Sequence, residues 1–160
     1  MPVTFNVRHV EDRTLHIEGK VSAEELDITA LDELIHVNKP LDYDLHVEKM
    51  ERSILVQGRL DLPLTCECAR CLKPFEHRLL LPDWACHLAL EGEEPVVISN
   101  DIVDLTPYIR EDIVLAFPQH PLCKPDCTGL EKPAEGPFAD PKDGTELTSS
   151  AWSELNKLKF

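Results

Sequence analysis

Six cysteines are the residues of this sequence whose type and spacing point most directly to chemistry. Three of them fall within the stretch CECARCLKPF, at Cys66, Cys68 and Cys71. Two more lie in CKPDC, at Cys123 and Cys127. Cysteines spaced this closely hold a metal ion, form a redox pair or pack in a core. The elements that carry them decide among these roles.

The strand pattern separates Cys66 from its two neighbours. From Ile54 to Cys68 apolar residues share one parity, and this period-two pattern predicts a half-buried strand. We expect Cys66 on this strand, and Cys86 on the next one, to pack in the core as small hydrophobic side chains. Cys68 and Cys71 form a C-x-x-C motif at the exit of the strand, where a tight turn can aim both sulfurs at one ion.

The CKPDC segment supplies a second cysteine pair, just beyond a predicted helix. Four thiolates around Zn²⁺ carry a net charge of about −2, which nearby cations offset. Basic residues lie beside the cysteines in an otherwise acidic chain, at Arg70, Lys73 and Lys124. This local bias favours a structural zinc site with four ligands, Cys68, Cys71, Cys123 and Cys127. Four protein ligands leave no open position for a zinc-activated water.

Three alternatives to this site stay open. His120 or Cys66 replaces one of the four ligands, or the four thiols hold no metal. A thioredoxin-like redox pair is disfavoured because the C-x-x-C motif follows a strand of a meander and opens no helix in a βαβ unit.

The remaining elements predict an α+β fold, in which a mainly antiparallel sheet packs against one helix. Three successive strands at residues 41–90 indicate a meander, and two short strands are expected within residues 1–19. A parity switch after Pro82 predicts a β-bulge, and Pro63 indicates an edge strand or an irregularity. A weak capping box at Ser22 and Glu25 suggests one short helical turn.

Helical spacing begins after Thr106 and predicts a helix at residues 107–116 that ends before Pro118. We expect its sheet side to bury Ile109, Ile113 and Phe117. We expect two regions: residues 1–127 form a single β-rich domain with the cysteine cluster, and 128–160 form a tail. The tail is expected to be loosely ordered around residues 128–148 and to end in a short helix.

Composition narrows the classes of partner. With 30 acidic and 16 basic residues the chain has a formal net charge of −14, which disfavours extended nucleic-acid binding and favours basic protein partners.

No apolar stretch resembles a secretory signal or a membrane span, so we expect a soluble cytoplasmic protein that binds no membrane. The sequence has no glycine-rich phosphate loop, nucleophile elbow or H-E-x-x-H motif, and its seven histidines are scattered, so we expect no enzyme and no small-molecule substrate.

Two motifs together resemble the bacterial YceD-like family, which is named for large ribosomal RNA subunit accumulation. They are LTCECARCLKPFEH and, further along, DIVDLTPYIREDIVLAFPQHPLCKPDC, and the terminal ELNKLKF is similar to the family's usual ending. The likeness covers roughly residues 15–130 and that ending. Many members carry a further C-P-x-C-G after a Gly-Leu pair, whereas here Gly129 and Leu130 lead into EKPAEGPF. The departure leaves two outcomes open: Cys123 and Cys127 rebuild the ligand set, or the site holds no metal.

The resemblance implies a non-enzymatic factor that supports accumulation or processing of large-subunit ribosomal RNA and assembly of the large ribosomal subunit. Its partner would be a ribosomal protein or a precursor large subunit, with RNA contact secondary because the chain is acidic. The alternatives are a zinc-stapled interaction module unrelated to ribosomes and a thiol redox protein.

Overall fold

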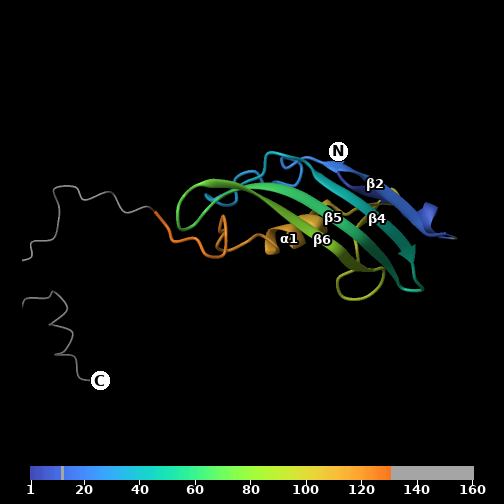
Figure 1. Cartoon of the computed structure of the whole chain (residues 1–160). Coiled ribbons are helices and arrows are strands. Elements are labelled where there is room, and N and C mark those ends of the chain that lie inside the picture. Colours follow the sequence, from blue (N-terminus) through green and yellow to red (C-terminus); the bar gives the residue numbers. More distant parts are fainter. Residues whose placement is uncertain (12, 131–160) are drawn as a thin grey trace, which may run out of the picture. The chain divides into compact units, whose positions relative to one another are not determined.

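A five-stranded antiparallel sheet forms the main layer of the protein. The structure is a computed structural model, described here for residues 1–11 and 13–130. The strands of this sheet are β2 (Leu15–Val21), β3 (Ile35–His36), β4 (Leu41–Lys49), β5 (Ser53–Glu67) and β6 (Pro74–Ala89). The order is β2-β4-β5-β3, and β6 pairs with the other side of β5. The strands β4, β5 and β6 follow one another in the chain and pair in sequence, so the predicted meander is confirmed (Figure 1).

A smaller sheet contains the start of the chain. It has the order β1-β8-β7, formed by β1 (Thr4–Asn6), β8 (Ile102–Asp104) and β7 (Ile98–Ser99). The two strands predicted within residues 1–19 are present, but they belong to different sheets. The Asn6 side chain accepts a hydrogen bond from the Arg8 backbone N–H at 2.9 Å and starts a 3₁₀ helix, η1 (Val7–Val10), that redirects the chain. At Ser22 and Glu25 the capping-box bonds form around one turn.

The irregularities of the long strands fall where the sequence predicts them. Leu60 pairs with Leu81 and Gly58 with Trp84, so two residues of β6 oppose one of β5 in a bulge at Pro82. Pro63 is opposite Arg78 of β6. On the other side of β5, pairing with β4 ends at Asp61 and pairing with β3 starts at Thr65, so Pro63 has no partner strand there. Its missing N–H therefore falls in the gap between two partner strands.

One helix, α1 (Thr106–Leu115), packs against one face of the large sheet (Figure 1). Pro107 occupies its first turn, where the missing N–H costs no helical hydrogen bond. Ile109 and Ile113 are fully buried in the main core, as predicted. Phe117 differs from the prediction: it lies beyond the helix end and is only partly buried against the core, since the chain turns away ahead of Pro118.

A polar contact fixes α1 to the edge of the bulge. The Trp84 indole N–H donates to the Asp112 carboxylate at 2.6 Å, and Trp84 is 5% exposed. We expect Trp84→Phe to lower the free energy of unfolding by about 1 kcal/mol, since the partly buried Asp112 carboxylate loses its donor. Denaturant unfolding of Trp84→Phe, Asp112→Asn and the double variant checks this. Additive single effects would contradict a direct coupling.

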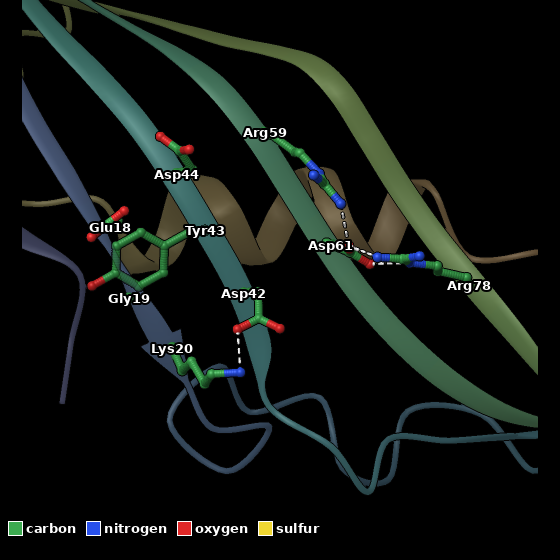
Figure 2. Close-up of a pocket in the computed structure, with 9 residues that line it drawn as sticks. All are labelled: Glu18, Gly19, Lys20, Asp42, Tyr43, Asp44, Arg59, Asp61 and Arg78. Carbon is green, nitrogen blue, oxygen red and sulfur yellow. Dashed lines mark hydrogen bonds and ion pairs between the residues drawn. The ribbon is translucent and has the colours of Figure 1, made fainter.

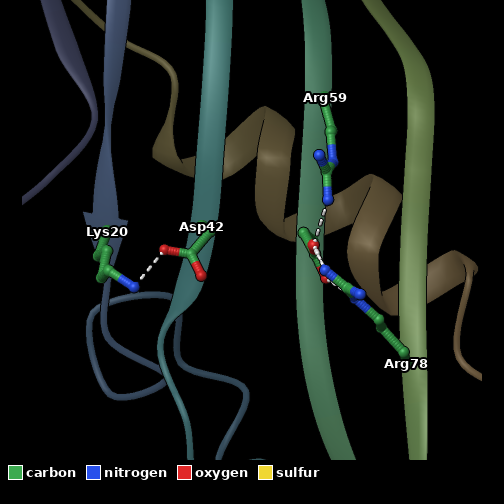
Figure 3. Close-up of polar contacts among 5 residues, drawn as sticks. Lys20, Asp42, Arg59 and Arg78 are labelled. Carbon is green, nitrogen blue, oxygen red and sulfur yellow. Dashed lines mark hydrogen bonds and ion pairs between the residues drawn. The ribbon is translucent and has the colours of Figure 1, made fainter.

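The opposite face of the large sheet, which we call the outer face, carries the even-numbered residues of β2 and β4 and the odd-numbered residues of β5 between Leu55 and Glu67. Asp61 is 6% exposed there and accepts hydrogen bonds from Arg59, at 2.7 Å, and from Arg78 (Figure 3). Lys20 pairs with Asp42 at 2.7 Å beside them. These side chains line a surface pocket (Figure 2).

The hydrogen bonds from Arg78, and secondly those from Arg59, lower the pKa of Asp61 although burial opposes them. A depressed carboxyl pKa contributes stability that is complete above the unfolded value and is lost as pH falls through the folded value. We therefore expect wild-type stability to fall below about pH 4, and to fall less steeply in Asp61→Asn. Unfolding free energies measured across acid pH check this; parallel curves would contradict it.

The predicted tail lies mostly at residues 131–160, outside the described residues, and so does its predicted terminal helix. Within residues 1–11 and 13–130, no helix has the length and apolar character needed to cross a membrane.

Candidate metal centre

The first cysteine pair sits on a tight turn directly after β5. The Leu72 N–H donates to the Cys68 carbonyl at 2.9 Å and the Cys68 N–H donates to the Lys73 carbonyl at 3.0 Å. Leu72 takes a left-handed conformation with φ of 59°, which closes the turn. Because the strand ends immediately before Cys68, its sulfur and that of Cys71 stand on one side of the turn.

The second pair follows α1 in an irregular segment that docks on this turn. The Ala69 N–H donates to the Pro121 carbonyl at 2.8 Å, and the Arg70 guanidinium donates to the Cys127 carbonyl at 2.9 Å. The Cys127 N–H in turn donates to the Lys124 carbonyl at 3.1 Å. Segments that are far apart in sequence are thus held together by one backbone hydrogen bond and by one of the basic residues beside the cysteines.

The four sulfurs form a compact group. The Sγ atoms of Cys68 and Cys127 are 3.7 Å apart, those of Cys71 and Cys123 are 3.7 Å apart, and all four lie within 4.8 Å of one another. All four thiols are free, so no disulfide explains the group. Ligands about 2.3 Å from a tetrahedral Zn²⁺ stand about 3.8 Å from each other. The two measured separations fit that geometry.

This group has its own small apolar setting. Cys68, Cys71 and Cys127 are 0%, 9% and 6% exposed and form a cluster separate from the main core, packed against Phe75 and Leu122. Such a cluster buries little surface, so hydrophobic burial alone stabilises the two loops weakly. A metal ion shared by the four sulfurs would cross-link the two loops and add to their stability.

The electrostatics of the sulfurs are uneven. Backbone N–H groups, first that of Cys123 and then that of Cys71, lower the pKa of Cys68 to about 6. Burial, and then the neighbouring thiols, raise the pKa of Cys123 to about 12. The thiolate form of Cys68 is therefore stabilised, while desolvation and the neighbouring thiols destabilise the thiolate form of Cys123. A divalent cation among the four sulfurs would remove that destabilisation, because metal-bound thiols are deprotonated.

The structure also places the other cysteines and the alternative ligand. Cys66 is 0% exposed in the main core, as strand parity predicts, and Cys86 is half-buried against it. Neither Cys66 nor the exposed His120 belongs to the cysteine group. Cys123 and Cys127 are the other two members of the group, although the chain lacks a C-P-x-C-G segment.

One group of ligand-type side chains among the described residues was not predicted from the sequence. His16, Asp44 and His46 come together on the outer face, with ligand atoms within 4.8 Å of one another. In the sequence, the three residues appear only as polar positions of the period-two pattern in the two strands. The pattern gains meaning only once β2 is known to pair with β4 in a particular register.

Comparisons with known proteins agree with these motifs. A family described as large ribosomal RNA subunit accumulation protein YceD matches residues 56–159, which include both cysteine pairs. Uncharacterized proteins of Mycobacterium tuberculosis and Mycobacterium bovis are each 30% identical over 154 residues, covering 91% of this chain and 71% of theirs. An uncharacterized Mycobacterium leprae protein is 27% identical over 105 residues, covering 61% of this chain and 48% of its own. No solved structure matches the chain. The chain therefore belongs to the YceD family of large ribosomal RNA subunit accumulation proteins.

Proposed function

We propose that this protein is a non-enzymatic factor of the cytoplasm that supports accumulation of large-subunit ribosomal RNA by acting in assembly of the large ribosomal subunit. The family match over residues 56–159 carries the proposal. The described residues supply the architecture for such a role: a long antiparallel sheet, one helix and two loops joined at four cysteines.

The four cysteines act as a structural zinc site in this proposal. Cys68 and Cys71 would hold the ion from the turn after β5, and Cys123 and Cys127 from the segment after α1. The bound ion supplies cross-linking and no reaction, because four protein ligands complete its coordination. The Arg70 guanidinium, which donates to the Cys127 carbonyl, helps to offset the residual negative charge.

The partner is a basic ribosomal protein or a precursor large subunit. A formal net charge of −14 favours association with a cationic protein surface and opposes direct contact with phosphate backbones. An acidic adaptor needs surface complementarity and no catalytic residue. RNA contact is secondary in this account.

Sedimentation of cell extracts tests the proposal. The protein should co-sediment with precursor large subunits, remain there after mild nuclease treatment, and dissociate as salt is raised. Its absence from these particles, together with normal large-subunit ribosomal RNA in cells lacking the protein, would rule the proposal out. Association with a basic protein that is no part of the ribosome would favour a general interaction module instead.

A further inference from the structure

Three metal-ligating side chains meet on the outer face, on elements that carry none of the four cysteines. They are His16 on β2 and Asp44 and His46 on β4, all exposed. We propose that these three residues bind a divalent transition metal ion of the Zn²⁺ type. The site is independent of the proposed function and of the cysteine centre.

Strand register brings the three side chains together. His16 is directly opposite His46 in the antiparallel pairing of β2 with β4, and Asp44 precedes His46 by two residues on the same face. Directly opposed side chains of an antiparallel pair start about 5 Å apart. The two imidazole rings stack accordingly, with centroids 4.6 Å apart and planes at 25°. Ligands carried by paired strands are held more rigidly than ligands carried by loops.

The distances suit an ion. His16 Nε2 lies 2.7 Å from Asp44 Oδ1. Two ligands bonded at about 2.1 Å to one Zn²⁺ stand about 3.0–3.4 Å apart. An ion takes the place of the shared proton once this contact opens and the stacked rings rotate, since an imidazole nitrogen binds a metal in the plane of its ring. Two imidazoles and one carboxylate suit Zn²⁺, Ni²⁺ or Cu²⁺, and three protein ligands leave the ion open to water or a partner's side chain.

Charge on the outer face also favours a cation here. Glu18 is directly opposite Asp44, and like charges so placed repel each other across a strand pair. Arg59 is directly opposite Asp44 on its other side, but its guanidinium donates to Asp61. Lys20 pairs with Asp42. Figure 2 shows Asp44 between Glu18 and Arg59 on the neighbouring strands. A metal ion at Asp44 would relieve the repulsion.

Equilibrium dialysis of the full chain against a series of free Zn²⁺ concentrations tests the site. We expect a Zn²⁺ equivalent separate from the cysteine centre, with a dissociation constant on the order of micromolar. His16→Asn and His46→Asn should each weaken this equivalent by about tenfold or more and leave cysteine-bound metal unchanged. His36→Asn is the matched control, because His36 has a carboxylate neighbour, Glu67 at 3.5 Å, but belongs to no such three-residue group.

A second measurement identifies the ligands directly. In imidazole-selective NMR, the His16 and His46 signals should shift together with the weaker Zn²⁺ equivalent, while the His36 signal stays in place. Absence of that equivalent would overturn the proposal. So would its full retention in His46→Asn, or an equal response of all seven histidines, which would mean adventitious binding only.

Discussion

Replacing Cys71 by serine is expected to abolish metal binding at the proposed four-sulfur centre and to lower the free energy of unfolding by about 3 kcal/mol or more. The turn after β5 and the segment after α1 meet at a small cluster that contains the four sulfurs. A serine hydroxyl is a poor ligand for a site built of thiolates, so the two segments lose their common ion. Metal analysis and denaturant unfolding of the purified full chain measure both effects.

Cys66 supplies the matched control. Its thiol is fully buried in the main core and stands outside the four-sulfur group. Cys66→Ala should therefore cost stability through lost packing but keep the full metal content. If Cys71→Ser and Cys66→Ala retain equal amounts of metal, the four-sulfur centre does not hold it.

Alkylation distinguishes the metal centre from a redox pair at the same residues. The Cys68 thiol has a pKa of about 6 but is 0% exposed, so it would react rapidly at neutral pH only if the turn opened as a redox pair requires. A closed metal centre predicts slow alkylation of Cys68 and Cys71 that accelerates when a chelator is added. Rapid alkylation without a chelator would favour the redox alternative.

Replacing Gly58 by alanine is expected to destabilise the sheet by about 3 kcal/mol or more. A Cβ atom at Gly58 would lie 2.1 Å from the Asp44 carbonyl oxygen and 2.8 Å from the Leu45 Cα, so β4 and β5 would have to move apart at the bulge. Backbone atoms of a paired strand cannot yield as a flexible side chain does. Thermal and denaturant unfolding of Gly58→Ala measure the loss.

Gly92→Ala is the control that distinguishes this steric clash from strain in the backbone conformation. Gly92 has φ of 128°, and a Cβ atom added there would meet nothing within 4 Å beyond its chain neighbours, so Gly92→Ala incurs backbone strain without a clash. We expect it to cost about 1 kcal/mol. Equal losses in the two variants would contradict the close approach of β4 to Gly58.

Local patterns in the sequence predict the meander, the bulge at Pro82 and the burial of Cys66 because each depends on the alternation of side chains along one strand. The buried residues of α1 follow from helical spacing in the same way. The cysteine spacing likewise predicts which four thiols gather, since Cys68 and Cys71 share one turn and Cys123 and Cys127 one short segment.

Features that depend on long-range pairing are not predictable in this way. The pairing of β1 with β8 joins the start of the chain to residues around Val103, and no local period encodes it. The group of His16, Asp44 and His46 needs the register of β2 against β4 across a long connection. A shift of one residue would turn His16 to the other face of the sheet.

We propose that this protein, with a metal ion bound at its four cysteines, supports accumulation of large-subunit ribosomal RNA. The most direct test is the ratio of large-subunit to small-subunit ribosomal RNA in cells whose only copy of the protein carries Cys71→Ser, compared with cells carrying Cys66→Ala at equal expression. We expect a lowered ratio with Cys71→Ser and a normal ratio with Cys66→Ala. A normal ratio in both, and in cells lacking the protein, would contradict the proposal.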